Sequence, residues 1–121
     1  MSINWKHRPD EHDYDAAWSY LTLITSTSEA DMRVADLCAL EDLSEHPAKD
    51  ILRASGLPLL PADNAHVAKD LIKVAEGQRL SPILLIHGRF GKHPLIIADG
   101  YHRVCAAYHL DENSTIPAKI V

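Results

Sequence analysis

The pattern of apolar and polar positions changes in character near Gly56. Before it, apolar residues recur every three or four positions, which is the spacing of one helix face. Three helices are predicted there, and their apolar positions are Ala16, Ala17, Tyr20, Leu21 and Ile24, then Met32, Ala35, Leu37, Leu40 and Leu43, then Ala48, Ile51, Leu52 and Ser55. Acids around Asp13 and Asp15 can start the first helix, the Ser/Thr run 25–28 ends it, and Gly56 ends the third.

The chain after Gly56 begins with a proline-containing segment and a helix. Residues 57–61 are apolar but include two prolines, so we expect only a short or edge strand there. Asp63 or Asn64 can then cap a helix that ends at Gly77. The polar face of this helix is expected to point outward and carries Lys69, Asp70 and Lys73.

Two apolar runs of four residues, 83–86 and 95–98, are joined by a glycine-containing loop, a pattern typical of a β-hairpin. Asp99-Gly100 then turns the chain into a helix from about Tyr101 to Leu110. A closing strand is expected at 116–121. The chain is therefore predicted to have an α+β fold, in which an N-terminal helical extension precedes a small mixed sheet with helices.

The chain is long enough for one compact core. Its 121 residues are 46% hydrophobic, which suits a single domain over residues 1–121 rather than two domains. Within it, we expect residues 1–56 to pack as a helical extension on a core formed by residues 57–121. No apolar run approaches the roughly 20 residues that cross a bilayer, and the N-terminus lacks the apolar stretch of a signal peptide. We therefore expect a cytoplasmic protein with no membrane partner.

Charge is distributed unevenly along the chain. The formal net charge of −5 argues against a nucleic-acid partner, because binding a phosphodiester backbone requires a cationic surface. Residues 1–60 hold 11 acids against 5 Lys and Arg, whereas residues 61–121 hold 6 acids against 7. An anionic ligand is therefore expected to bind to the second half.

Neither the cysteines nor the N-terminal acids indicate a metal or redox site. Cys38 and Cys105 are too few for a disulfide framework and too isolated for structural zinc, so we expect reduced core residues. The segment with His7, Asp10, Glu11, His12, Asp13 and Asp15 matches no metal-binding spacing. It is predicted to be a solvated tail.

The segment from Asp99 to Arg103 predicts an anion-binding turn. A buried strand that opens directly into a helix directs several backbone N–H groups, without intrahelical partners, toward one place at the positive end of the helix dipole. Gly100 permits the sharp turn and lets a ligand approach the backbone. His102 and Arg103 add side-chain donors, and a guanidinium suits phosphate oxygens.

Each residue of this segment also has a structural interpretation. An Asp-Gly turn before a helix is common, and an arginine in a first turn is often only solvated. Asp99 either helps to hold magnesium or only fixes the turn by accepting backbone N–H bonds. Tyr101 either stacks on a base or packs against neighbours on the same helix face.

The stretch from Leu57 to Val121 resembles the ParB/sulfiredoxin-like superfamily in the order of its parts. A proline-containing approach segment, a helix, the run 80–86, a hairpin and the run 95–107 follow one another as in ParB-type N-terminal domains. The most specific part is a Gly-x-His-Arg element, here Gly100-Tyr101-His102-Arg103. In that superfamily this element binds the phosphates of ATP or CTP, so the resemblance implies a nucleotide-binding role for these residues.

Two branches of the superfamily fit this chain poorly. Sulfiredoxins place their reactive cysteine between the glycine and the histidine of the element, where this chain has Tyr101. Cys105 lies one turn further along among apolar neighbours, so we expect a packed thiol rather than a nucleophile. Chromosome-partitioning ParB proteins continue into a helix-turn-helix and a dimerisation region, whereas this chain stops at Val121.

A free-standing domain of this type also resembles the superfamily's small-molecule kinases, which phosphorylate free serine. Such a reaction needs a carboxylate or imidazole near an acceptor hydroxyl and usually Mg²⁺. The resemblance points to Asp63 as base or metal ligand and to His66 as a second phosphate contact. Asp99 is the third candidate catalytic residue, with the two interpretations given above. In the alternative interpretation, Asp63 is an ordinary helix cap and His66 an ordinary first-turn residue.

The leading hypothesis is therefore a nucleotide-binding protein, which as an enzyme would be a phosphotransferase acting on a small-molecule acceptor or an NTP hydrolase. The alternative is a non-enzymatic module in which nucleotide binding changes how the N-terminal helices meet a protein partner or form a homodimer. A nuclease is the third and weakest hypothesis, because the chain is acidic and has no dense carboxylate cluster.

Overall fold

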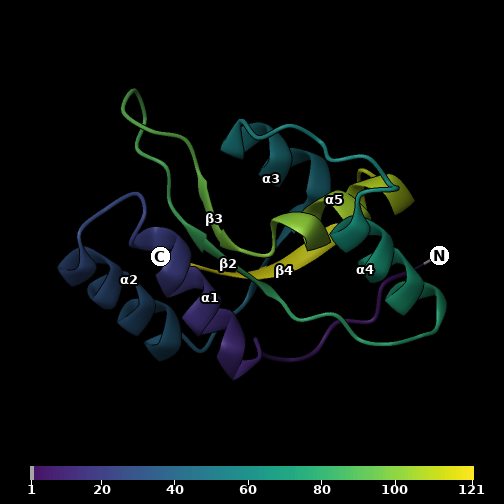
Figure 1. Cartoon of the computed structure of the whole chain (residues 1–121), viewed down its shortest axis with the longest axis horizontal. Coiled ribbons are helices and arrows are strands. Elements are labelled where there is room, and N and C mark those ends of the chain that lie inside the picture. The colour runs from purple at the N-terminus through teal and green to yellow at the C-terminus, as the bar shows by residue number, and fades with distance from the viewer. Residues whose placement is uncertain (1) are drawn as a thin grey trace.

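The computed structural model describes residues 2–121 and shows a mixed α+β fold (Figure 1). In this part of the chain, five helices and a four-stranded sheet are formed. In chain order they are α1 (Glu11–Leu21), α2 (Thr27–Ala39), β1 (Ser44–Pro47), α3 (Ala48–Ser55), α4 (Ala65–Ala75), β2 (Ile83–Ile86), β3 (Ile96–Asp99), α5 (Tyr101–Leu110) and β4 (Thr115–Ile120). Among the described residues, none of the helices has the length and apolar character needed to cross a bilayer.

The strand directions determine which chain segments meet at each end of the sheet. The strand order is β1-β4-β2-β3. β2 runs parallel to β4 and antiparallel to β3, and β1 runs antiparallel to β4. The carboxyl ends of β2 and β4 therefore lie at the same end of the sheet. The carboxyl end of β3, with Asp99, lies at the opposite end.

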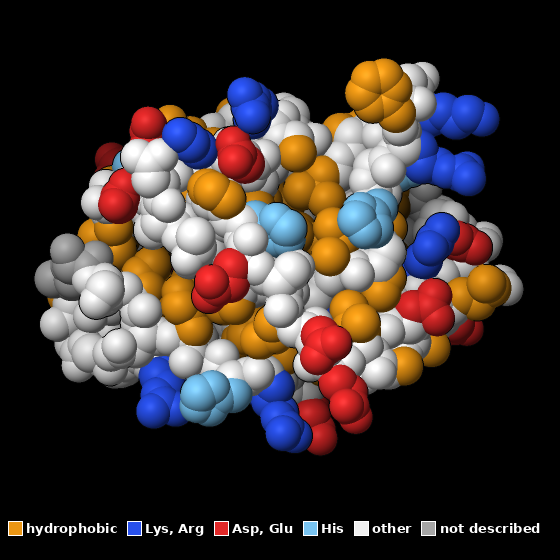
Figure 2. Space-filling view, turned by 180° about the vertical axis from the view of Figure 1, so that it is seen from behind, with side chains coloured by type: hydrophobic (Ala, Val, Ile, Leu, Met, Phe, Trp, Pro, Cys, Tyr) orange, Lys and Arg blue, Asp and Glu red, His pale blue; other side chains and the backbone are white. Residues whose placement is uncertain are grey.

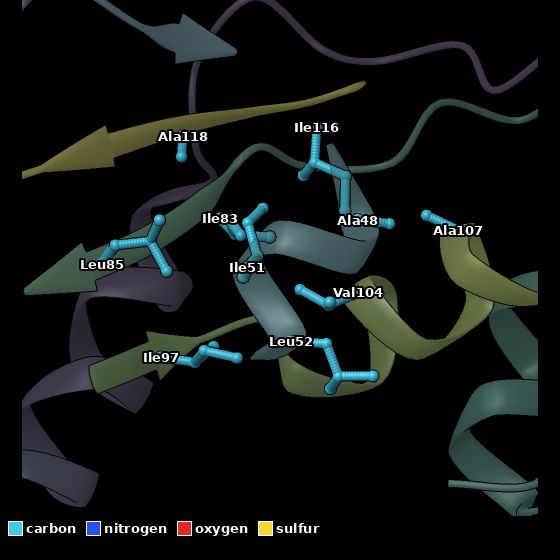
Figure 3. Close-up of a cluster of buried hydrophobic side chains, with 10 residues drawn as sticks. All are labelled: Ala48, Ile51, Leu52, Ile83, Leu85, Ile97, Val104, Ala107, Ile116 and Ala118. Carbon is cyan, nitrogen blue, oxygen red and sulfur yellow. The ribbon is translucent and has the colours of Figure 1, made fainter. Parts of the chain in front are cut away.

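The central strand β2 is buried on both faces. Ile83 and Leu85 face a core that α3 and α5 complete, and Figure 3 shows these side chains directed toward one another. Leu84 and Ile86 face a second core formed with α1 and α2. The sheet is thus the middle of three layers, and α4 packs on the outside of α5 through Val67.

A buried lysine ties the last strand to the second helix. Lys119 is only 6% exposed, and its Nζ donates to the carbonyl oxygen of Leu37 at 3.1 Å. That carbonyl lies in the last turn of α2, where carbonyl groups lack intrahelical partners. The same Nζ lies 5.4 Å from the centroid of the Tyr14 ring, so the charge is placed between two favourable partners.

The N-terminal segment 1–56 is more than a helical extension. It contains β1, which forms the edge of the sheet beside β4, with Ser44 opposite Ala118. It also contains α3, which supplies part of the central core. Near the start of the chain, Lys6 N donates to Leu80 O at 2.8 Å, and Leu80 N donates to Asn4 O at 2.8 Å. Residues from both sides of position 56 therefore share the same sheet and core.

The predicted boundaries of the first two helices were wrong. α1 ends at Leu21, so Ile24 lies beyond it. The Ser/Thr run does not merely end a helix, because Ser26 caps the next one by accepting the N–H of Glu29 at 3.1 Å. α2 stops at Ala39 and leaves the predicted Leu40 and Leu43 outside.

Residues 57–61 do not form the predicted short or edge strand. Prolines cannot donate to a strand ladder, and side chains of α5 bind the carbonyl groups of this segment instead. The hydroxyl of Tyr101 donates to the carbonyl of Pro58, and the His109 ring bonds Leu60 O at 2.7 Å. One edge strand of the sheet is β1, which the periodicity of the sequence did not indicate.

The acidic segment predicted to be a solvated tail forms the first turn of α1. Asp13 is 3% exposed, and its Oδ2 accepts the N–H of Asp10 at 3.0 Å in a capping box. Asp10 in turn accepts from Ser81 Oγ at 3.0 Å. The N-terminal acids therefore anchor α1 to the loop before β2.

The predictions around the hairpin and the last helix were confirmed. β2 and β3 form an antiparallel hairpin, and α5 spans Tyr101–Leu110 as expected. Gly56 ends α3 in the left-handed conformation, with φ 69°.

We expect Gly100→Ala to lower the free energy of unfolding by about 3 kcal/mol, because two costs combine. Gly100 has φ 110°, and a Cβ there would lie 2.4 Å from Ile83 Cγ2. The matched control is Gly56→Ala, at φ 69° with nothing within 4 Å of the added Cβ, which should cost only about 1 kcal/mol. Urea unfolding measures both, and equal losses would contradict the close approach.

Candidate functional site

A polar hollow of about 200 Å³ lies between α4 and the turn from β3 to α5. One wall is the polar face of α4, with His66, Lys69, Asp70 and Lys73. The other wall consists of Asp99, Gly100, His102 and Arg103. The hollow therefore brings together most of the residues predicted from the Gly-x-His-Arg element and the polar face of the preceding helix.

The first turn of α5 forms the floor of the hollow. Gly100 is the N-cap residue, so the N–H groups of Tyr101, His102 and Arg103 have no partner within the helix. The helix dipole places positive potential at the same point. Because Gly100 has no side chain, nothing on the glycine itself keeps a ligand from the backbone.

Arg103 is held by a short ion pair across one turn. Its Nη2 lies 2.8 Å from Asp99 Oδ2, and the two side chains are 17% and 16% exposed. The same Nη2 lies 3.4 Å from Pro82 O, whereas the buried Nε makes no hydrogen bond to any residue from 2 to 121. The guanidinium is thus fixed in direction and keeps an unused donor.

Burial raises the pKa of Asp99, although Arg103 beside it works in the opposite direction. The carboxylate of Asp13 adds a smaller upward contribution to the pKa of Asp99, and His12 a downward one. The N-terminal turn of α1 is therefore part of the electrostatic environment behind the hollow. The sequence had left the relation of the N-terminal helices to this site open.

Two carboxylates of this region that could serve as metal ligands, Asp99 and Asp10, each already have a cationic partner. Asp99, predicted as a Mg²⁺ ligand, already pairs with Arg103. Ligand atoms of Asp10, His12 and Asp13 lie within 4.8 Å of one another, but both Oδ atoms of Asp10 lie 2.9 Å from Lys6 Nζ. A metal ion bound by Asp10, His12 and Asp13 would therefore compete with the Lys6 ammonium group for the Asp10 carboxylate.

Asp70 is a site residue that the sequence analysis did not identify. The sequence predicted that Asp70 points away from the core with Lys69 and Lys73. It does, and there it lines the hollow between α4 and α5. Burial raises its pKa, although the nearby charges of Arg103, Lys73, His102 and His66 lower it. The available signal was the helical spacing of His66, Lys69, Asp70 and Lys73, which places all four on one face.

Two histidines of the hollow, one from α4 and one from α5, lie against each other. The ring centroids of His66 and His102 are 4.7 Å apart. Burial lowers the pKa of His102, and the charge of His66 lowers it further. His102 therefore favours its neutral form, and an anion bound beside it would favour the charged form.

Four other residues considered in the sequence analysis lie outside the lining of the hollow. Asp63 is exposed and does not cap α4, since Asn64 accepts the N–H groups of His66 and Val67. Tyr101 directs its hydroxyl to Pro58 and packs its ring against the core. Cys105 is buried in the α4–α5 contact, and burial raises the pKa of its thiol, whereas Cys38 is exposed rather than in the core.

The arrangement combines free N–H groups at a helix N-terminus with ammonium, guanidinium and imidazole groups. Such a combination binds small oxyanions, above all phosphate. The chain was also compared with known families, curated proteins and solved structures. No family model matches it, and no curated protein or solved structure does either.

Proposed function

We propose that the hollow between α4 and α5 binds the phosphate groups of a nucleotide. The observation that carries the proposal is the opening of the α5 N-terminus onto a space lined by Lys69, Lys73, His102 and Arg103. The resemblance of Gly100-Tyr101-His102-Arg103 to the phosphate-binding element of ParB/sulfiredoxin-like proteins supports ATP or CTP as the ligand.

The size of the hollow limits what it can recognise. Its volume of about 200 Å³ is smaller than the roughly 300–1,000 Å³ of pockets that enclose a drug-sized ligand. Phosphate groups fit, whereas the sugar and base would extend over the surface. Affinity would therefore depend mainly on the number of phosphates and only weakly on the base.

Phosphotransfer to a small-molecule hydroxyl is a second candidate function, and Asp70 favours it. A carboxylate beside a phosphate site can take a proton from an acceptor hydroxyl as the new O–P bond forms, while the bond from the γ-phosphorus to the β–γ bridging oxygen breaks and the nucleoside diphosphate leaves. Asp63, the base proposed from sequence, lies outside the hollow. Binding without turnover would instead favour the nucleotide-responsive interaction module.

We expect the double change Lys69→Gln and Lys73→Gln to weaken ATP and CTP binding about tenfold, because two charge-assisted contacts are lost. Isothermal titration with ATP, CTP, GTP and ADP, with and without Mg²⁺, measures the effect. The matched control is Arg53→Gln, which removes an exposed helix cation outside the hollow. Absence of binding by every nucleotide would exclude the proposed function, and equal weakening by the control would exclude this site.

We expect sulfate to bind more tightly as pH falls from about 8 to 5, because protonation of His102 and Asp70 makes the hollow more positive. Sulfate keeps a constant charge over this range, so the change reports the protein alone. Asp70→Asn should raise the affinity about threefold at neutral pH by removing a negative charge, while Asp50→Asn, an exposed acid on α3, should have no effect. Titration calorimetry at several pH values measures this, and an affinity insensitive to both pH and Asp70→Asn would contradict it.

A further inference from the structure

A second hollow lies at the other end of the sheet from Asp99. It has a volume of about 700 Å³ and opens between the loop that follows α1 and the start of the β2–β3 hairpin. Ile86, the last residue of β2, and Val121, which directly follows β4, form part of its wall. Ligand sites in α/β proteins commonly lie beyond the carboxyl ends of parallel strands.

The inner wall of this hollow is hydrocarbon. It is formed by Leu21, Ile24, Ile86, Ile96 and Val121. Leu21 and Ile86 belong to the core between the sheet and the α1–α2 layer, so the floor of the hollow is part of the packed interior. Ile24, beyond the end of α1, is 50% exposed. A hydrocarbon chain lying on this wall would remove apolar surface from water.

The rim of the hollow is cationic. It carries Arg33, Arg89, His87 and His93, and Glu29 is the acid among the lining residues. Glu29 Oε1 lies 2.9 Å from Arg33 Nε, so its charge is already balanced. The hairpin therefore contributes unbalanced positive charge, and Figure 2 shows blue cationic side chains gathered where the hairpin projects at the upper right.

Arg89 is the cation best placed to meet a ligand. Its backbone is fixed, because its N–H donates to His93 O at 2.9 Å and its carbonyl accepts from Lys92 N at 2.8 Å. Its side chain makes no hydrogen bond or ion pair with residues 2–121. His93 bonds Pro94 O through Nδ1 at 2.9 Å, which leaves Nε2 available. A hydrogen-bonded turn thus presents free polar groups beside an apolar wall.

We propose that this second hollow binds an amphipathic organic anion, with a carboxylate at Arg89 and an aliphatic chain on the wall formed by Ile24, Ile86 and Ile96. The volume lies within the roughly 300–1,000 Å³ of small-molecule pockets, which favours a small ligand over a protein partner. The apolar wall excludes simple phosphates and sulfates as the preferred ligands. The site is independent of the proposed nucleotide site, which lies at the opposite end of the sheet.

Three matched ligands test this inference by isothermal titration into the full chain. Decanoate has both the chain and the charge, decanol has only the chain, and acetate has only the charge. We expect saturable binding of decanoate, binding at least tenfold weaker for decanol, and none for acetate, because a charge-assisted hydrogen bond contributes about this much. Absence of decanoate binding, or equal binding of decanol, would overturn the proposal.

Variants locate the binding site. Arg89→Gln and Ile24→Asn should each weaken decanoate binding about tenfold or more. Lys92→Gln changes a cation of the same loop that does not line the hollow, and Lys73→Gln changes the other hollow; neither should alter decanoate binding. Weakening by Lys73→Gln equal to that by Arg89→Gln would place the anion elsewhere and overturn the proposal. Light scattering provides a second test. If the chain forms a dimer that Ile24→Asn disrupts, and decanoate does not bind, a second copy covers this face and the proposal is overturned.

Discussion

The burial of β2 on both faces is the constraint on which the rest of the structure depends. Its four residues alternate between two cores, so Ile83 and Leu85 hold the α3–α5 layer while Leu84 and Ile86 hold the α1–α2 layer. Dense packing around Ile83 leaves no room for a side chain on the neighbouring Gly100. The start of α5, and with it the floor of the polar hollow, is therefore set by the position of one buried isoleucine.

The direction of the strands then separates two chemically different places on one small sheet. The carboxyl end of β3 leads into the N-terminus of α5, where backbone N–H groups and α4 cations line the polar hollow. The carboxyl ends of β2 and β4 lead to the second hollow, where hydrocarbon surface meets a cationic rim. Both hollows are cationic although the chain carries a net charge of −5, because many acids lie on the exposed N-terminal helices.

The pKa values of the two acids in the polar hollow, Asp70 and Asp99, are set by burial and by nearby charges. Asp99 and Asp70 both have raised pKa values because burial disfavours their charged forms, and nearby cations only partly offset this. The carboxylate of Asp99 forms an ion pair with Arg103 and so orients the guanidinium. Asp70 makes no such hydrogen bond to the described residues, and this leaves it free to respond to a ligand or to pH.

Local signals were sufficient for the part of the fold around the site. The hairpin, the left-handed Gly56 and the helix from Tyr101 to Leu110 each depend on residues adjacent in sequence, so the sequence alone predicted them. Gly100, His102 and Arg103 were also named from the sequence as the centre of the candidate site, and they line the polar hollow. The helix boundaries near Ile24 were wrong because the capping interaction of Ser26 competes with apolar periodicity.

Only the tertiary structure decided what depends on partners distant in sequence. Ser44 pairs with Ala118, and an otherwise ambiguous polar segment thereby becomes an edge strand. The polar face of α4 becomes part of a site only because α4 packs on α5, which turns Asp70 toward Arg103. The second hollow likewise forms where α1, the hairpin and the end of β4 meet. Short-range patterns fix dihedral angles and caps, whereas a hollow depends on the packing of several elements, and that packing is a property of the whole chain.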